Sequence, residues 1–247
     1  MSNAQPDIIQ TSRNNCVKIE SPSAKVSGTG FFLDEQRIAT CFHVISKIDV
    51  QGTNVKWEIF QDLKVILENG DTLDAKCVSQ PTQNDPSPLF MDFAVVKLNS
   101  KSTLQIKPNP LSTVDANPVV GSEVFFSGYP LATPAMVTHK GMVSGVSTDG
   151  SIICVQAPVN KGNSGGALLN SKGEIIGIIS MREGGISQGL MELSKYIQST
   201  ESQGSVQIMG VDPLQATKEI INVLDIYIST GIGYARSVKF LRTYLNK

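Results

Sequence analysis

The 247-residue sequence lacks the features that mark membrane-spanning and nucleic-acid-binding proteins. No stretch approaches the roughly 20 uninterrupted apolar residues that cross a bilayer. No basic run is present, and 21 basic against 22 acidic side chains leave a net charge of −1, so we expect neither nucleic acid nor a membrane as a partner. Charged residues make up only 17% of the chain and hydrophobic residues 40%, which excludes disorder and predicts a substantial core.

Cysteine is also scarce, and its pattern argues against two kinds of chemistry. None of the four cysteines lies in a C-x-x-C pair, so a zinc site and thioredoxin-like chemistry have little support. Free buried thiols are the simpler interpretation, and they favour a reducing compartment. Residues 1–6 have neither the basic nor the apolar segment of a secretion signal. We therefore expect a cytoplasmic protein, or a periplasmic or secreted one if a signal peptide has been removed.

The stretch of residues 161–167, KGNSGGA, is the centre of the sequence argument. Its serine, Ser164, is flanked by glycines, which allow positive φ and a close approach to a substrate. Backbone N–H groups in such a turn can bind a developing oxyanion, so we assign Gly162, Asn163 and Ser164 to an oxyanion hole. A purely structural turn is the alternative, because glycine-rich turns that contain serine are common.

A serine nucleophile needs a base and an orienting carboxylate, and the sequence offers both. Of the two histidines, His43 ends an expected strand at residues 38–43, whereas His139 matches no catalytic pattern and is expected at a strand end, exposed or hydrogen-bonded. Asp92 stands at the start of an apolar strand, where an unpaired carboxylate is costly. Asp85 is a weaker rival because it lies in a loop. With one histidine committed to catalysis, we expect no metal site and no cofactor.

Five blocks of sequence follow one another in a specific order. They are residues 28–33 (GTGFFL), 38–45 (IATCFHVI), 92–98 (DFAVVKL), 161–170 (KGNSGGALLN) and 231–235 (GIGYA). Together they resemble the chymotrypsin-like (trypsin-fold) serine proteases, and most closely the HtrA/Deg branch. Unlike most members of that branch, the sequence shows no PDZ-like domain after the last block.

The resemblance implies an all-β fold with added helices, in which two six-stranded β-barrels enclose the site. We expect an N-terminal arm at residues 1–12, a first barrel at 13–110 that carries the histidine and the aspartate, and a second barrel at 111–247 that carries the serine. Within the second barrel, residues 182–230 form an insertion with two amphipathic helices where the family has a short loop. Residues 238–245 form a C-terminal helix.

The resemblance also places a substrate pocket beside the serine. Its expected wall residues are Pro158, Val159, Ser180, Met181 and Ile232. None of them carries a carboxylate, so we expect a preference for small or medium apolar side chains at the cleaved residue. Ser180 also stands where relatives have a residue that supports the buried aspartate, with an ordinary surface serine as the alternative.

The expected function is that of a serine endopeptidase acting on polypeptides. Ser164 forms the acyl-enzyme, His43 transfers the proton and Asp92 orients the imidazole. Two alternatives stay open: a catalytically inactive binding module with the same fold, and an esterase or acyltransferase with the same three residues. For residues 182–230, packing on the outside of the barrel, restriction of substrate entry and self-association into an oligomer are all open.

Overall fold

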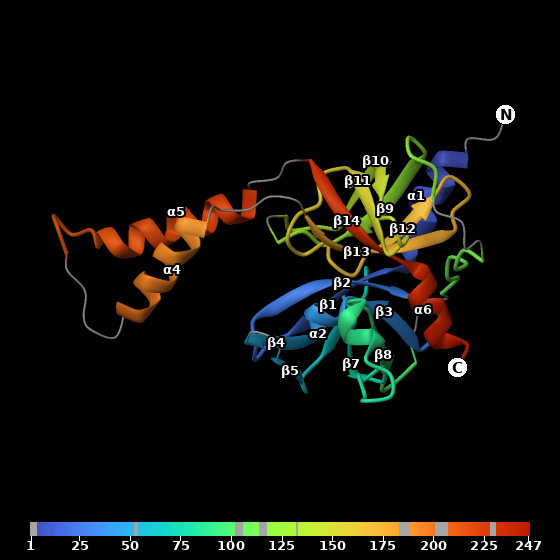
Figure 1. Cartoon of the computed structure of the whole chain (residues 1–247), viewed down its shortest axis with the longest axis horizontal. Coiled ribbons are helices and arrows are strands. Elements are labelled where there is room, and N and C mark those ends of the chain that lie inside the picture. The colour runs from blue at the N-terminus through green and yellow to red at the C-terminus, as the bar shows by residue number, and fades with distance from the viewer. Residues whose placement is uncertain are drawn as a thin grey trace.

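The structure, a computed structural model, describes residues 4–51, 54–101, 106–113, 118–131, 133–182, 188–200, 207–227 and 231–247. Two β-barrels stack on each other, and a pair of helices stands off the second barrel (Figure 1). This double barrel with added helices confirms the fold expected from the resemblance. Within the described residues, no helix is long and apolar enough to span a membrane.

The first barrel is closed by six antiparallel strands in the order β1-β2-β3-β8-β7-β6. These strands are β1 (Cys16–Ser21), β2 (Val26–Phe32), β3 (Arg37–Thr40), β6 (Lys64–Ile66), β7 (Thr72–Cys77) and β8 (Ala94–Leu98). Successive side chains of a strand point to opposite faces, and the inward ones here are apolar. Ile19, Ile38, Val65 and Val96 are completely buried in the resulting core.

Two short helices and a small sheet flank the first barrel. The strand expected over residues 38–43 ends at Thr40, and His43 lies instead on the one-turn helix α2 (Phe42–Ile45). The ring of Phe42 packs edge-on against Trp57 at 5.9 Å, which anchors this turn to the two-stranded sheet of β4 (Ser46–Gln51) and β5 (Asn54–Ile59). The helix α3 (Ser87–Phe90) was not expected from the sequence, because a single turn carries no clear periodicity. The strand β4 was not expected either, although its apolar Ile48 and Val50 alternate with polar residues.

The second barrel is closed by six antiparallel strands in the order β10-β11-β14-β13-β12-β9. These strands are β9 (Glu123–Gly128), β10 (Val137–Val146), β11 (Ile152–Gln156), β12 (Ala167–Asn170), β13 (Ile175–Arg182) and β14 (Ile232–Ser237). Its core is a separate cluster that contains Phe126, Val155, Leu168 and Ile179, each 0% exposed. The two cores are therefore distinct, and the site lies where the barrels face each other.

From residue 4 onward, the N-terminal arm expected at residues 1–12 is folded onto the second barrel. It forms the helix α1 (Ala4–Asn15), which packs against β9 of the second barrel. Ile8 is buried, and the Ser12 hydroxyl forms a 2.8 Å hydrogen bond with that of Ser127. The helix is mostly polar, so its apolar pattern is weak, and docking on the barrel supplies the stabilisation that the local sequence lacks.

The C-terminal helix α6 has the predicted bounds, Val238–Leu245. The Ser237 side chain caps it by accepting a hydrogen bond from the Lys239 N–H. Leu241 is completely buried, and the ring of Tyr244 meets that of Phe93 in the first barrel at 5.6 Å. The helix thus links the end of the second barrel to the first (Figure 1).

The insertion contains the two predicted helices, α4 (Gln188–Thr200) and α5 (Pro213–Tyr227). Asp212 caps α5, because its carboxylate accepts hydrogen bonds from the N–H groups of Leu214 and Gln215. The helices pack against each other and project away from both barrels (Figure 1). We call this pair the α4–α5 hairpin.

Candidate active site

Ser164 lies on a tight turn that precedes β12. Gly162 and Gly165, on either side of the serine, both have left-handed backbone, with φ of +97° and +94°. A Cβ atom at Gly165 would meet the Thr29 carbonyl oxygen at 1.9 Å, so only glycine fits there. The sequence therefore dictates this turn locally, as the spacing of its glycines predicted.

Thr29, on β2 of the first barrel, fastens this turn across the interface between the barrels. Its hydroxyl donates to the Gly162 carbonyl at 2.6 Å and accepts from the Tyr129 N–H at 3.0 Å. Its own N–H donates to the Ser164 carbonyl at 2.8 Å. The position of Ser164 relative to the first barrel thus depends on one buried threonine.

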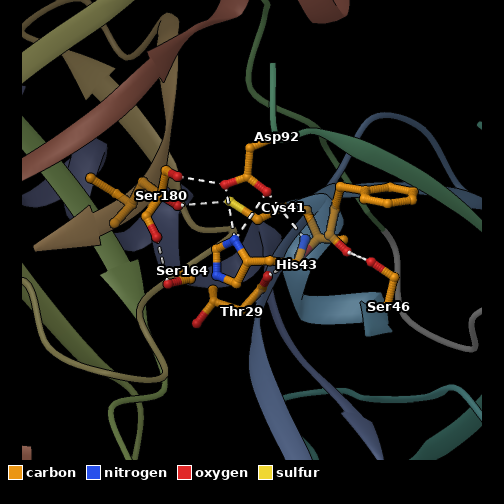
Figure 2. Close-up of polar contacts among 10 residues, drawn as sticks. Thr29, Cys41, His43, Ser46, Asp92, Ser164 and Ser180 are labelled. Carbon is orange, nitrogen blue, oxygen red and sulfur yellow. Dashed lines mark hydrogen bonds and ion pairs between the residues drawn. The ribbon is translucent and has the colours of Figure 1, made fainter. Parts of the chain in front are cut away.

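His43 and Asp92 form a close pair on the first barrel. The Nδ1 atom of His43 lies 3.0 and 2.9 Å from the two carboxylate oxygens of Asp92, and the His43 backbone N–H also donates to Asp92 at 3.1 Å. Asp92 has left-handed backbone, φ +49°, in the turn between α3 and β8, a conformation that aspartate tolerates. Figure 2 shows the imidazole between Asp92 and Ser164.

Burial and hydrogen bonding have opposite effects on the pKa values of His43 and Asp92. Burial of the imidazole disfavours its charged form, but the hydrogen bond and the negative charge of Asp92 outweigh this, so the pKa of His43 is raised. Burial alone would raise the pKa of Asp92, but the hydrogen bonds and charge of His43, with a further hydrogen bond from Ser180, lower it. The carboxylate therefore stays ionised and holds the imidazole by Nδ1.

Ser180 supports Asp92, as the resemblance implied. Its hydroxyl donates to a carboxylate oxygen of Asp92 at 2.5 Å, and its side chain is buried. The alternative of an ordinary surface serine does not hold. On its other side, the Ser180 carbonyl accepts the hydroxyl proton of Ser164 at 2.8 Å (Figure 2).

The backbone of the turn presents donors to the site. Among the described residues, the N–H groups of Gly162 and Ser164 form no hydrogen bond, whereas that of Asn163 donates to the Asn160 carbonyl at 3.0 Å. Two of the three amides assigned to the oxyanion hole are therefore available to a ligand. The Asn163 side chain is completely buried, and its amide atoms have no partner in the described part of the chain.

A pocket of about 470 Å³ contains His43, Asp92 and Ser164 in its wall. Of the five predicted substrate-binding residues, Val159 and Ser180 line this pocket. The structure describes Met181 only as part of strand β13.

The other two predicted wall residues, Pro158 and Ile232, line a second pocket of about 560 Å³, together with Lys140 and Ser144. Val159 lines the first pocket and directly follows Pro158, which lines the second, and it is 1% exposed. A Cβ atom at Gly233 would lie 2.2 Å from a methyl carbon of Val159, so that side chain fills the space beside the glycine. The expected wall residues are thus distributed over two pockets.

The environment of His139 differs from the prediction in two respects. It lies inside β10 rather than at a strand end, and its ring packs on that of Phe126 with centroids 4.9 Å apart. Its Nε2 atom is buried without a partner among the described residues, and burial lowers its pKa. It lines neither pocket described above.

Cys41 brings a third titratable group to the pair. Its Sγ atom lies within 4.8 Å of a ring nitrogen of His43 and of a carboxylate oxygen of Asp92, and these two atoms also lie within that distance of each other. The sequence did not predict this group of possible metal-ligand atoms. Burial and the Asp92 charge raise the pKa of the Cys41 thiol, which donates to the Ile179 carbonyl at 3.2 Å. The thiol is thus a neutral neighbour of the pair, and all four cysteines of the chain are free.

Known proteins share the part of the chain that carries this site. Residues 28–178, more than half of the chain, match the family model of the trypsin-like peptidase domain. The chain belongs to the trypsin-like peptidase family. The matched segment contains His43, Asp92 and Ser164, and it confirms the resemblance drawn from the sequence blocks.

This chain has named relatives in the HtrA/Deg branch. It is 34% identical to protease Do-like 1, chloroplastic, of Arabidopsis thaliana, over 62% of this chain and 32% of that protein. It is 31% identical to serine protease Do-like HtrA of Lactobacillus helveticus (67% and 35%) and to serine protease HTRA3 of Homo sapiens (63% and 33%). The chain therefore spans about a third of the length of these relatives.

Three residues that surround the candidate site were not predicted from the sequence. Thr29 stands between two glycines of the first block, and Cys41 lies two residues before His43, but neither position signals its contacts. Arg236, which lines the same pocket as Ser164, follows directly after the last block. Each of these roles depends on contacts between segments far apart in the chain.

Proposed function

We propose that this peptidase is a serine endopeptidase that hydrolyses polypeptides through an acyl-enzyme on Ser164. The observation that carries the proposal is the His43–Asp92 pair, with Nδ1 held at 2.9 Å and the opposite side of the ring facing Ser164. In this arrangement His43 takes the hydroxyl proton as Ser164 attacks the scissile carbonyl, and later gives it to the leaving amine. Asp92 fixes the tautomer and stabilises the imidazolium.

The Ser164 hydroxyl must turn before it reacts. It donates to the Ser180 carbonyl, and transfer of its proton requires rotation toward Nε2 of His43. Such contacts are commonly long or misaligned before substrate binds. The N–H groups of Gly162 and Ser164 would then receive the carbonyl oxygen as it becomes negative, and the loss of one such donor typically costs about 10²–10³-fold in rate.

A fluorophosphonate probe tests this mechanism. Mass spectrometry should locate the covalent adduct on Ser164, and Ser164→Ala should lose the adduct together with about 10⁶-fold in kcat. Ser171→Ala, at an exposed turn serine on the same barrel, is the matched control and should keep both. Absence of any adduct in the unaltered protein would favour the inactive binding module.

Substrate class is tested with two substrates of the same sequence, one with a peptide bond and one with an ester bond at the cleavage site. An endopeptidase hydrolyses both, and Ser164→Ala abolishes both reactions. Hydrolysis of the ester alone would contradict the proposed function and favour the esterase or acyltransferase.

A further inference from the structure

Arg236, on β14, faces the space between the two barrels. Side chains alternate along a strand, and the preceding residue, Ala235, is completely buried in the core of the second barrel. Arg236 therefore points away from that core. Its partner on the neighbouring strand, Ile178, packs in the cluster of the first barrel. The guanidinium is thus placed on the side of the second barrel that meets the first.

The pocket that Arg236 lines is the one that contains Ser164 and His43. The described structure gives Arg236 no ion pair and no side-chain hydrogen bond. Among the residues that the structure describes, Asp92 is the only acidic one in the pocket wall, and its carboxylate already binds His43 and Ser180. Lys161 adds a second positive charge to the wall.

The remaining contacts in the pocket are largely apolar. Ile48 of β4 and Leu89 and Phe90 of α3, elements that flank the first barrel, line the same pocket as Arg236. A partly buried cation beside apolar side chains loses hydration without gaining a partner. A guanidinium is always charged and presents a planar fork of donors that matches a carboxylate. A carboxylate brought in from outside would therefore satisfy a group that the described part of the chain leaves unpaired.

We infer that Arg236 is a specificity-determining residue that binds an aspartate or glutamate side chain of the substrate. The substrate class is thus a polypeptide with an acidic residue close to the scissile bond. This inference rests on the proposed function, because it places the acidic side chain in the pocket that holds Ser164. It is compatible with an apolar cleaved residue, since Val159 restricts the space beside Gly233 whereas Arg236 acts on a neighbouring side chain.

The test is a library of peptides blocked at both ends, so that no terminal carboxylate competes for Arg236. Each position near the cleaved bond carries aspartate, asparagine or lysine in turn. At one position, we expect kcat/KM to be about tenfold higher for aspartate than for asparagine, a ratio that falls as salt screens the charges. Arg236→Gln should bring this ratio close to one, and Arg236→Glu should favour lysine.

Two further variants separate charge recognition from general damage. Arg236→Lys keeps the charge without the fork and should retain part of the preference. Lys140→Gln removes a cation from the second pocket and should leave the ratio unchanged. A preference for aspartate that survives Arg236→Gln would overturn the inference, as would an equal loss in Lys140→Gln.

Binding measured without catalysis distinguishes this inference from the proposed function. The Ser164→Ala variant and its double variant with Arg236→Gln are titrated with the aspartate and asparagine peptides, labelled for fluorescence anisotropy. Tighter binding of the aspartate peptide that depends on Arg236 supports the inference even if no hydrolysis is found. Equal affinities for the two peptides would refute it even if hydrolysis is normal.

Discussion

The double barrel and the α4–α5 hairpin bury their apolar side chains to very different extents. In the barrels, large side chains such as Phe31, Phe93 and Phe126 are at most 1% exposed. Among the hairpin side chains that the structure describes, only Ile197 and Ile221 are buried. Other large apolar side chains of the hairpin are more than a third exposed, namely Leu193, Tyr196, Leu214, Ile220, Val223 and Leu224.

This difference separates the part of the chain that builds the site from the part that does not. Neither Ile197 nor Ile221 belongs to the core cluster of either barrel. Every described contact that positions Ser164, His43 and Asp92 comes from barrel residues or from the turns that join them. We therefore expect the stability and chemistry of the barrels to depend little on the hairpin.

The largest expected effect is on the free energy of unfolding. Phe126→Ala should lower it by about 3–5 kcal/mol, because it removes a completely buried ring from the second barrel. The matched change in the hairpin, Ile220→Ala, should cost less than about 0.5 kcal/mol, since that side chain is 60% exposed. Urea denaturation of both variants measures the difference. Equal losses would mean that Ile220 is packed in solution as tightly as Phe126.

The pH dependence of activity should depend on the barrels alone. The base in the proposed mechanism is neutral His43, whose pKa is raised by Asp92 against the effect of burial. We expect kcat/KM to reach half its maximum at a pH above the ordinary histidine value of about 6.5 and to fall about tenfold per pH unit below it. Asp92→Asn removes the charge that raises this pKa, so the residual activity should have its midpoint at lower pH.

The control for this profile is a protein without the hairpin. The α4–α5 hairpin contains no histidine, so its removal should leave the midpoint unchanged. A shift of the midpoint on removal would show that the hairpin alters the electrostatics of the site.

The smallest effect is expected when residues 184–229 are replaced by a short linker. The free energy of unfolding should change by less than about 0.5 kcal/mol, and small peptides should be cleaved within about twofold of the original rate. Denaturation and peptide assays measure both. A larger loss of stability would mean that the hairpin packs on the barrel in solution.

Two further readouts of the same variant address the alternatives left open by the sequence. Faster cleavage of folded substrates, with small peptides unaffected, would mean that the insertion restricts entry. A smaller apparent mass in size-exclusion chromatography, beyond that of the deleted residues, would mean that the insertion mediates self-association.

Single turns, strands and helices of this protein could be predicted from the sequence alone. The glycines around Ser164 are required by backbone conformations that other residues rarely adopt, so the turn could be predicted from its spacing. A short run of consecutive apolar residues located the strand β9, and amphipathic spacing located α6 with its bounds. These features depend on neighbours within a few residues, and that is the range over which periodicity is informative.

The contacts between these elements depend on the tertiary structure and could not be predicted from the sequence. Thr29 binds Gly162 across 133 positions of the chain, and Ser180 binds Asp92 across 88. Closure of the barrels brings such residues together, and no local pattern records it. The helix α1 likewise depends on a surface of β9 that its own residues cannot specify. Arg236 lies on an ordinary strand in the sequence, and only the packing of one barrel on the other places it in the pocket of Ser164.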